Sequence, residues 1–122
     1  MKYLEKIITK ELLRKVLPKE TENLSEDFSF YIDEDYIVFR DEGETLFDYN
    51  IYKFAFKCKE WALSKGYIIN SGVTTSNYWC CTIYKIIKEN PYIKELSHTW
   101  EQSESEAIFK ACEFILIKKE SK

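Results

Sequence analysis

The chain of 122 residues has little of several features that mark particular protein classes. Three Gly and two Pro are too few for a collagen-like or linker-rich chain. No apolar run approaches the roughly 20 residues that a membrane-spanning helix needs, and the N-terminus lacks the uninterrupted apolar stretch of a secretory signal. The sequence therefore predicts a soluble, cytoplasmic protein with no membrane partner.

Residues that carry chemistry are scarce or poorly spaced. The chain has one histidine, His98, and no two of its four cysteines form the C-x-x-C pair of a zinc site. The acidic run at 33–35 lacks the Gly and the distal acid of an EF-hand loop. We therefore expect no metal, no cofactor, no catalytic residue and no enzymatic activity. The alternative is a cysteine-dependent enzyme that pairs Cys80 or Cys81 with His98, although a buried cysteine usually behaves as a small hydrophobe.

Hydrophobic residues, by contrast, are plentiful, at 45% of the chain with three Trp, nine Tyr and eight Phe. A chain of this length with this much apolar material can build one core. We expect a single domain over residues 1–122, in which an N-terminal helix and an acidic hairpin (1–47) precede a helix-hairpin-helix module (48–122).

Apolar periodicity predicts three helices, at 3–17, at 51–65 and from 103 onward. Pro18 ends the first, Asp48 or Asn50 caps the second at its start and Gly66 at its end, and Ser103 opens a capping box for the third.

Short β-branched and aromatic runs predict strands at 28–32, 36–40, 45–47, 67–70, 78–86 and 96–100, with a three-residue turn at 33–35. The order α-β-β-α-β-β-(β)-α predicts an α+β fold in which helices cover a mostly antiparallel sheet.

The second half has a polar cap before an aromatic-rich helix, a Gly66-Tyr67 entry to a hairpin, and a last helix that opens with Glu106, Ala107 and Ile108. With these features, about residues 47–118 resemble the phage αβα-sandwich domain family. The resemblance implies a small phage or prophage accessory protein that acts in the host cytoplasm. No catalytic residue follows from it.

Charge is distributed very unevenly along the chain. Residues 20–48 carry eleven acids and only one base, Arg40, whereas the segments on either side are net positive. Such a block repels nucleic acid and attracts a basic surface. We interpret it as a partner-binding hairpin of a non-enzymatic protein, most specifically an inhibitor of a basic, nucleic-acid-handling host defence enzyme; the alternative is a solvated hairpin that protects an edge strand. The predicted contact residues are Asp33, Glu34, Asp35, Asp41, Glu42 and Glu44.

A cationic stripe on the first helix, formed by Lys2, Lys6, Lys10 and Arg14, gives two further possibilities. It is either an ordinary solvated face or a surface that meets the acidic hairpin of a second copy, which makes a homodimer possible.

Aromatic residues exceed the needs of one narrow core. Tyr52 and Phe56 lie off the main apolar face of their helix, so we expect exposed aromatics. Exposed Tyr and Trp anchor protein interfaces and also stack on nucleobases. The alternative function is therefore a small-molecule or nucleotide-binding protein with a pocket lined by Trp79, Tyr84 and Trp100.

Overall fold

The computed structural model describes residues 7–73, 78–86, 93–96 and 103–120, and it confirms the α+β class. Its helices are α2 (Lys10–Val16), α3 (Pro18–Thr21), α4 (Ile51–Ser64) and α5 (Glu104–Glu120). Its strands are β1 (Ser29–Asp33), β2 (Tyr36–Asp41), β3 (Glu44–Asn50), β4 (Tyr67–Val73), β5 (Trp79–Lys85) and β6 (Ile93–Leu96). Within these ranges no helix has both the length and the apolar character needed to cross a membrane.

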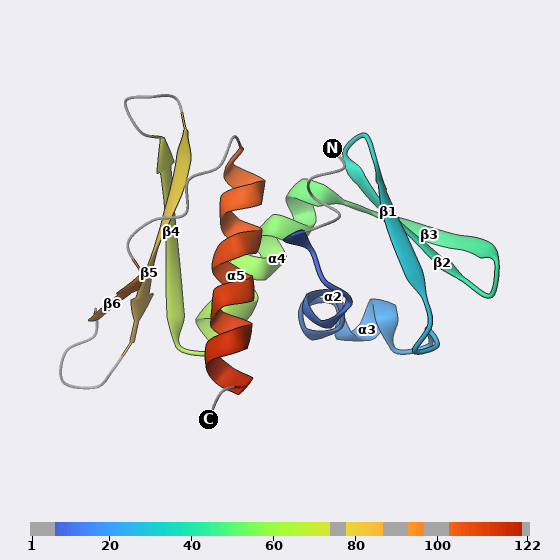
Figure 1. Cartoon of the computed structure of the whole chain (residues 1–122), viewed down its shortest axis with the longest axis horizontal. Helices are drawn as coiled ribbons and strands as arrows, with labels where there is room; N and C mark the ends of the chain where they lie inside the picture. The colour runs from blue at the N-terminus through green and yellow to red at the C-terminus, as the bar shows by residue number, and fades with distance from the viewer. Residues whose placement is uncertain (1–6, 74–77, 87–92, 97–102, 121–122) are drawn as a thin grey trace.

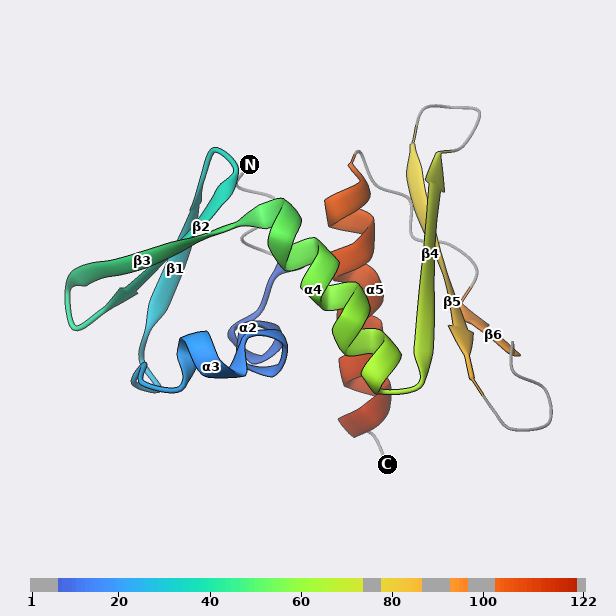
Figure 2. The ribbon, with the colours of Figure 1, turned by 180° about the vertical axis from the view of Figure 1, so that it is seen from behind.

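The strands form two antiparallel sheets of three strands each, ordered β1-β2-β3 and β4-β5-β6, with the helices between them (Figure 1). Figure 2 shows α4 running from the end of β3 toward the start of β4. Its 14 residues span about 21 Å at the rise of an α-helix. This length carries the chain from the first sheet to the second, so the two hairpins do not join into one sheet.

The helix predicted at 3–17 is interrupted, because Ile8 and Thr9 are not helical and α2 begins only at Lys10. Residues 1–6 lie outside the described part, and α2 begins after Thr9, whose hydroxyl accepts a hydrogen bond from the Leu12 backbone N–H at 3.1 Å. Pro18 does not simply end a helix. It is the first residue of α3, where its fixed φ suits the helix and its missing N–H removes no helical hydrogen bond.

The turns of the first sheet differ from the predicted ones. Asp33 pairs with Tyr36, so the β1–β2 turn holds two residues rather than three, and Glu34 adopts a φ of +52°. Glu42 and Gly43 both have positive φ in the β2–β3 turn, as a type I′ hairpin requires. With that turn in place β3 extends over seven residues instead of the predicted three.

Both predicted ends of α4 are confirmed. The side chain of Asn50, rather than Asp48, is the cap, and it accepts hydrogen bonds from the backbone N–H groups of Tyr52 (2.9 Å) and Lys53 (3.1 Å). Gly66 has a φ of +91°, a left-handed conformation that favours glycine after a helix.

The C-terminal elements match the prediction in order but not always in position. β4 extends to Val73, three residues beyond the predicted end. β6 lies at Ile93–Leu96 rather than 96–100, and residues 97–102 lie outside the described part. Ser103 caps α5 as predicted, because its Oγ accepts a hydrogen bond from the Glu106 backbone N–H at 3.2 Å.

One cluster of buried apolar side chains joins the helices to both sheets. Phe54 of α4 packs on Phe109 of α5 with ring centroids 5.3 Å apart, and Phe39 of β2 stacks on Phe47 at 4.5 Å. The Thr9 hydroxyl also donates a 2.8 Å hydrogen bond to Glu113 of α5, although burial raises the pKa of that carboxyl. The N-terminal elements are therefore fastened to the C-terminal helix by apolar packing and by a polar contact.

Candidate binding surface

The six predicted contact residues form two groups rather than one patch. Asp33, Glu34 and Asp35 lie at the β1–β2 turn, whereas Asp41, Glu42 and Glu44 lie at the β2–β3 turn. β2 separates the two turns, and its six residues span roughly 20 Å at the rise of a strand. A partner that contacts both groups must therefore lie along the whole sheet.

Asp41 has a structural role in the second group. Its carboxylate accepts hydrogen bonds from the Ser25 hydroxyl (2.6 Å) and from the Ser25 backbone N–H (2.8 Å). These hydrogen bonds, the side-chain one foremost, lower the pKa of Asp41. The carboxylate thereby fastens the segment before β1 to the end of β2, which leaves it less available to a partner.

The first group continues onto the outer face of the sheet. Ile37 and Phe39 of β2 point into the core, so the alternation of a strand turns Val38 to the opposite face. The cross-strand partners of Val38 are Tyr31 and Asp48, and these share its face.

The neighbouring cross-strand row of that face pairs Asp33 with Tyr36. We define the acidic face as these two cross-strand rows together with the β1–β2 turn that adjoins them. Its residues are Tyr31, Asp33, Glu34, Asp35, Tyr36, Val38 and Asp48.

Within the described part of the chain, no ion pair neutralises the carboxylates of the acidic face. Arg40 lies on the same side of the sheet as the acidic face. Its guanidinium, however, donates a hydrogen bond to the Gly43 carbonyl at 2.9 Å, toward the β2–β3 turn. The Tyr52 hydroxyl donates to Asp35 at 3.4 Å. The exposed Asp33, Glu34 and Asp48 therefore present an uncompensated negative potential beside two exposed tyrosines.

Tyr31, Tyr36 and Asp48 were absent from the predicted contact set. Tyr31 and Tyr36 are about two-fifths exposed, and Val38 beneath them is only 7% exposed although it faces away from the helices. The strand alternation that identifies these residues was present in the sequence. Its register, however, depends on the length of the β1–β2 turn.

The predicted aromatic pocket is not assembled by the described residues. Trp79 packs against the core on the same side of β5 as Cys81 and Ile83, whereas Tyr84 is half-buried on the other side. Neither lines any of the three cavities described below, and Trp100 lies outside the described part.

Three cavities instead follow α4, and neighbouring ones share lining residues. The first, of about 490 Å³, lies where β3 meets the helix and is lined by Tyr36, Asp48, Tyr49, Asn50 and Lys53. The second, of about 640 Å³, continues along the helix and is lined by Tyr49, Asn50, Tyr52, Lys53, Phe56, Lys57 and Glu60. Tyr52 and Phe56 are more than half exposed, which confirms that aromatics off the main face of this helix reach the surface.

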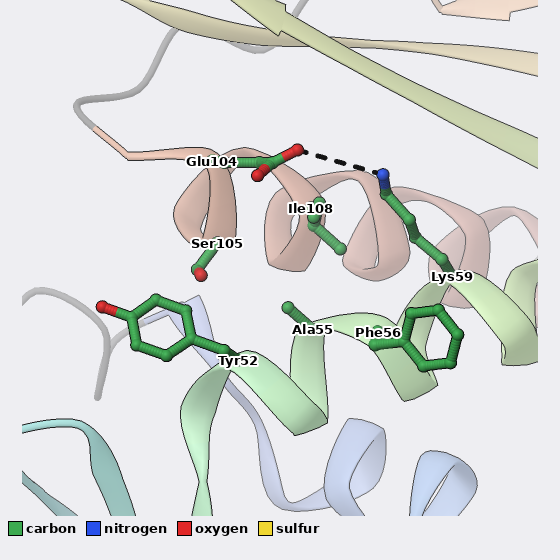
Figure 3. Close-up of a pocket in the computed structure, with 7 residues that line it drawn as sticks. All are labelled: Tyr52, Ala55, Phe56, Lys59, Glu104, Ser105 and Ile108. Carbon is green, nitrogen blue, oxygen red and sulfur yellow. Dashed lines mark ion pairs between the residues drawn. The ribbon is translucent and has the colours of Figure 1, made fainter.

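The third cavity, of about 170 Å³, lies between α4 and α5 (Figure 3). Lys59 and Glu104 point toward one another above it, with 4.0 Å between Lys59 Nζ and Glu104 Oε2. Ser71 of β4 accepts a 3.2 Å hydrogen bond from Lys59 and donates a 2.5 Å hydrogen bond to Glu104. These contacts tie α4, β4 and α5 together, and the small cavity beneath them is a packing feature of that junction.

The remaining predicted groups lie in structural settings. Cys58, Cys81 and Cys112 are buried, Cys80 is half-buried, and burial raises the pKa of Cys81 to about 12. Near neutral pH such a thiol is almost entirely protonated, which disfavours it as a nucleophile. His98, its predicted partner, lies outside the described residues.

Lys10 and Arg14, the described residues of the cationic stripe, contact other parts of the chain. Arg14 lies 4.8 Å and Lys10 5.2 Å from the Phe28 ring, and Arg14 donates a 2.8 Å hydrogen bond to the Ser25 carbonyl. Lys2 and Lys6 lie outside the described part. Arg14 therefore fastens the segment before β1, and it is a poor candidate for a contact with a second copy.

Comparisons with family models, curated proteins and solved structures find no match to this chain. The resemblance to the phage domain family therefore stays a prediction.

Proposed function

We propose that this protein is a non-enzymatic binding protein whose acidic face docks onto a basic surface of another protein. The observation that carries the proposal is the group of exposed carboxylates of Asp33, Glu34 and Asp48 beside Tyr31 and Tyr36, with no ion pair to neutralise them in the described part of the chain. Carboxylates steer a basic partner, and exposed tyrosines supply the apolar anchors that interfaces favour.

The chemistry of the face favours a partner rich in arginine and lysine. An arginine can pair with a carboxylate through two hydrogen bonds and stack on a tyrosine ring, and this face offers both groups one strand apart in the Asp33–Tyr36 row. Proteins that handle nucleic acid present basic grooves of this kind. Our specific proposal is an inhibitor of such an enzyme, in which the carboxylates occupy the place of nucleic-acid phosphates.

The test is capture from a host lysate with three immobilised forms of the chain, followed by quantitative mass spectrometry. The site variant neutralises the acidic face with Asp33→Asn, Glu34→Gln, Asp35→Asn and Asp48→Asn. The matched control makes the same change of charge on exposed acids of α3 and of the segment between α3 and β1, with Glu20→Gln, Glu22→Gln, Glu26→Gln and Asp27→Asn.

We expect a basic protein that the native chain and the control retain and the site variant loses. Raised salt should release it, because exposed charges are screened within about 10 Å at 0.1 M ionic strength. Duplex DNA should displace it if its basic groove binds nucleic acid. Equal capture by the native chain and the site variant would contradict the proposal, and so would the absence of any protein specific to the native chain.

A further inference from the structure

The solvent-facing side of α4 carries an apolar stripe of its own. Tyr52, Phe56 and Leu63 are 57%, 64% and 56% exposed. Their spacings of four and seven residues place them along one line of the helix, which extends about 16 Å. The opposite side of α4, with Phe54, Cys58 and others, lies in the core. Lys59 lies on the same line between Phe56 and Leu63, but it is half-buried and its ammonium is held by Glu104 and Ser71. The exposed side chains of the line are thus apolar, and no described residue covers them.

Three charged side chains accompany this stripe: Lys53, Lys57 and Glu60. Lys53 and Glu60 are exposed, lie seven residues apart, and line the same cavity as Tyr52 and Phe56. A separation of seven residues is two helical turns, so both side chains lie on the same flank of the stripe. Lys57 lies between them but about 40° further round the helix, away from the stripe. The edge of the flank next to the stripe is therefore basic near the start of α4 and acidic near its end.

This pattern is self-complementary under a two-fold rotation. The midpoint between Lys53 and Glu60 and the midpoint between Tyr52 and Leu63 differ by only one residue along the helix. A two-fold axis that crosses α4 between them brings Lys53 toward Glu60 of a second copy, and Tyr52 toward Leu63 of that copy. Isologous interfaces need this kind of surface, because each patch must fit itself reversed.

We propose that a second copy of this chain covers the stripe, with the two α4 helices packed antiparallel. Phe56 lies near the axis and packs against its own counterpart, while two Lys53–Glu60 pairs flank the contact. This dimer differs from one that joins the cationic stripe of α2 to the acidic hairpin, because only α4 residues carry it. It does not depend on the proposed function, because no residue of the acidic face carries it, although Tyr52 and Lys53 adjoin that face.

Sedimentation velocity from low micromolar to millimolar concentration tests the proposal. We expect a reversible dimer whose dissociation constant rises roughly a hundredfold in Phe56→Glu, because each dimer carries the substitution twice at the centre of the contact. Leu46→Glu is the matched control: it places the same charge on an exposed apolar residue of β3 and should leave the dissociation constant unchanged. Circular dichroism shows whether each variant is folded.

The charged flank gives a sharper test. Lys53→Glu and Glu60→Lys should each weaken the dimer about fivefold, and the double variant should return to within about twofold of the native value, because the pairs are re-formed with reversed sign. A native chain that stays monomeric at millimolar concentration would overturn the proposal. So would a dimer that Phe56→Glu leaves intact, or a double variant weaker than both single ones.

Discussion

The two sheets share one layer of helices and differ sharply in charge. Residues 29–50, which form the first sheet, carry seven acids and one base. Residues 67–85, which form the β4–β5 hairpin of the second sheet, carry a single charged side chain, Lys85. Both central strands nevertheless place fully buried side chains in the same core, Phe39 from β2 and Ile83 from β5.

This difference shows that a sheet of this fold does not require a high density of charge. The β4–β5 hairpin pairs along seven residues with no acid, and β4 is itself an edge strand. An antiparallel sheet on these helices therefore needs no dense block of carboxylates. Of the acids on the first sheet, Asp41 has a structural task because Ser25 binds it, whereas the exposed Asp33 and Glu34 of the β1–β2 turn have no such contact among the described residues.

The largest expected effect comes from removing an aromatic ring that anchors the acidic sheet. Phe39 is fully buried and stacks on Phe47 (4.5 Å) and Phe28 (6.1 Å), so Phe39→Ala should lower the free energy of unfolding by about 3–5 kcal/mol. Urea denaturation followed by tryptophan fluorescence measures this loss of stability. All three tryptophans lie beyond residue 60 and therefore outside the first sheet, so they report whether the rest of the chain unfolds with it.

If the chain unfolds as one unit, Phe39→Ala in the first sheet also lowers the urea midpoint that tryptophan fluorescence reports. A tryptophan transition that stays at its native midpoint, while circular dichroism shows an earlier loss, would mean that the two sheets unfold separately. Leu46→Ala, at an exposed position of β3, should cost about 0.5 kcal/mol or less.

A smaller effect is expected at Arg14, which joins α2 to the segment before the acidic sheet. Its guanidinium donates hydrogen bonds to the Ser25 and Thr21 carbonyls and lies over the Phe28 ring. Arg14→Ala should therefore destabilise the fold by about 1–2 kcal/mol in urea denaturation. Lys15→Ala removes the same charge from an exposed neighbour and should have almost no effect. Equal effects of the two variants would show that net charge, not the contacts of Arg14, is responsible.

Local side-chain chemistry was predictable from the sequence, and long-range pairing was not. Asn50, Gly66 and Ser103 were recognised because each acts on backbone groups within a few residues. The position of β6 was missed because it pairs with β5 across a register shift at Ile83 and Tyr84. The division into two sheets was missed because strand order alone does not reveal which hairpins are neighbours.

The acidic face was only partly predictable for a related reason. A three-residue turn would place Ile32 opposite Tyr36 and turn both to one side of the sheet, whereas the observed two-residue turn pairs Tyr36 with Asp33. A shift of one residue exchanges the two faces of a strand. The acids of the first turn were found by composition alone, and the tyrosines beside them required the register.

The smallest expected effect distinguishes the two kinds of acid on the first sheet. Hydrogen bonds from Ser25 hold the pKa of Asp41 below its usual value, so the ionised carboxylate stabilises the folded state above the pKa of the unfolded chain. Asp41→Ala should lower the urea midpoint at pH 7, by less than Arg14→Ala does. The loss should shrink as the pH falls through the Asp41 pKa, because the native chain then loses the same interaction. Glu34→Ala, at the exposed β1–β2 turn, should show no such pH dependence. If Asp41→Ala matched Glu34→Ala at every pH, the structural role of Asp41 would be wrong, and both acidic groups would be equally free to bind a partner.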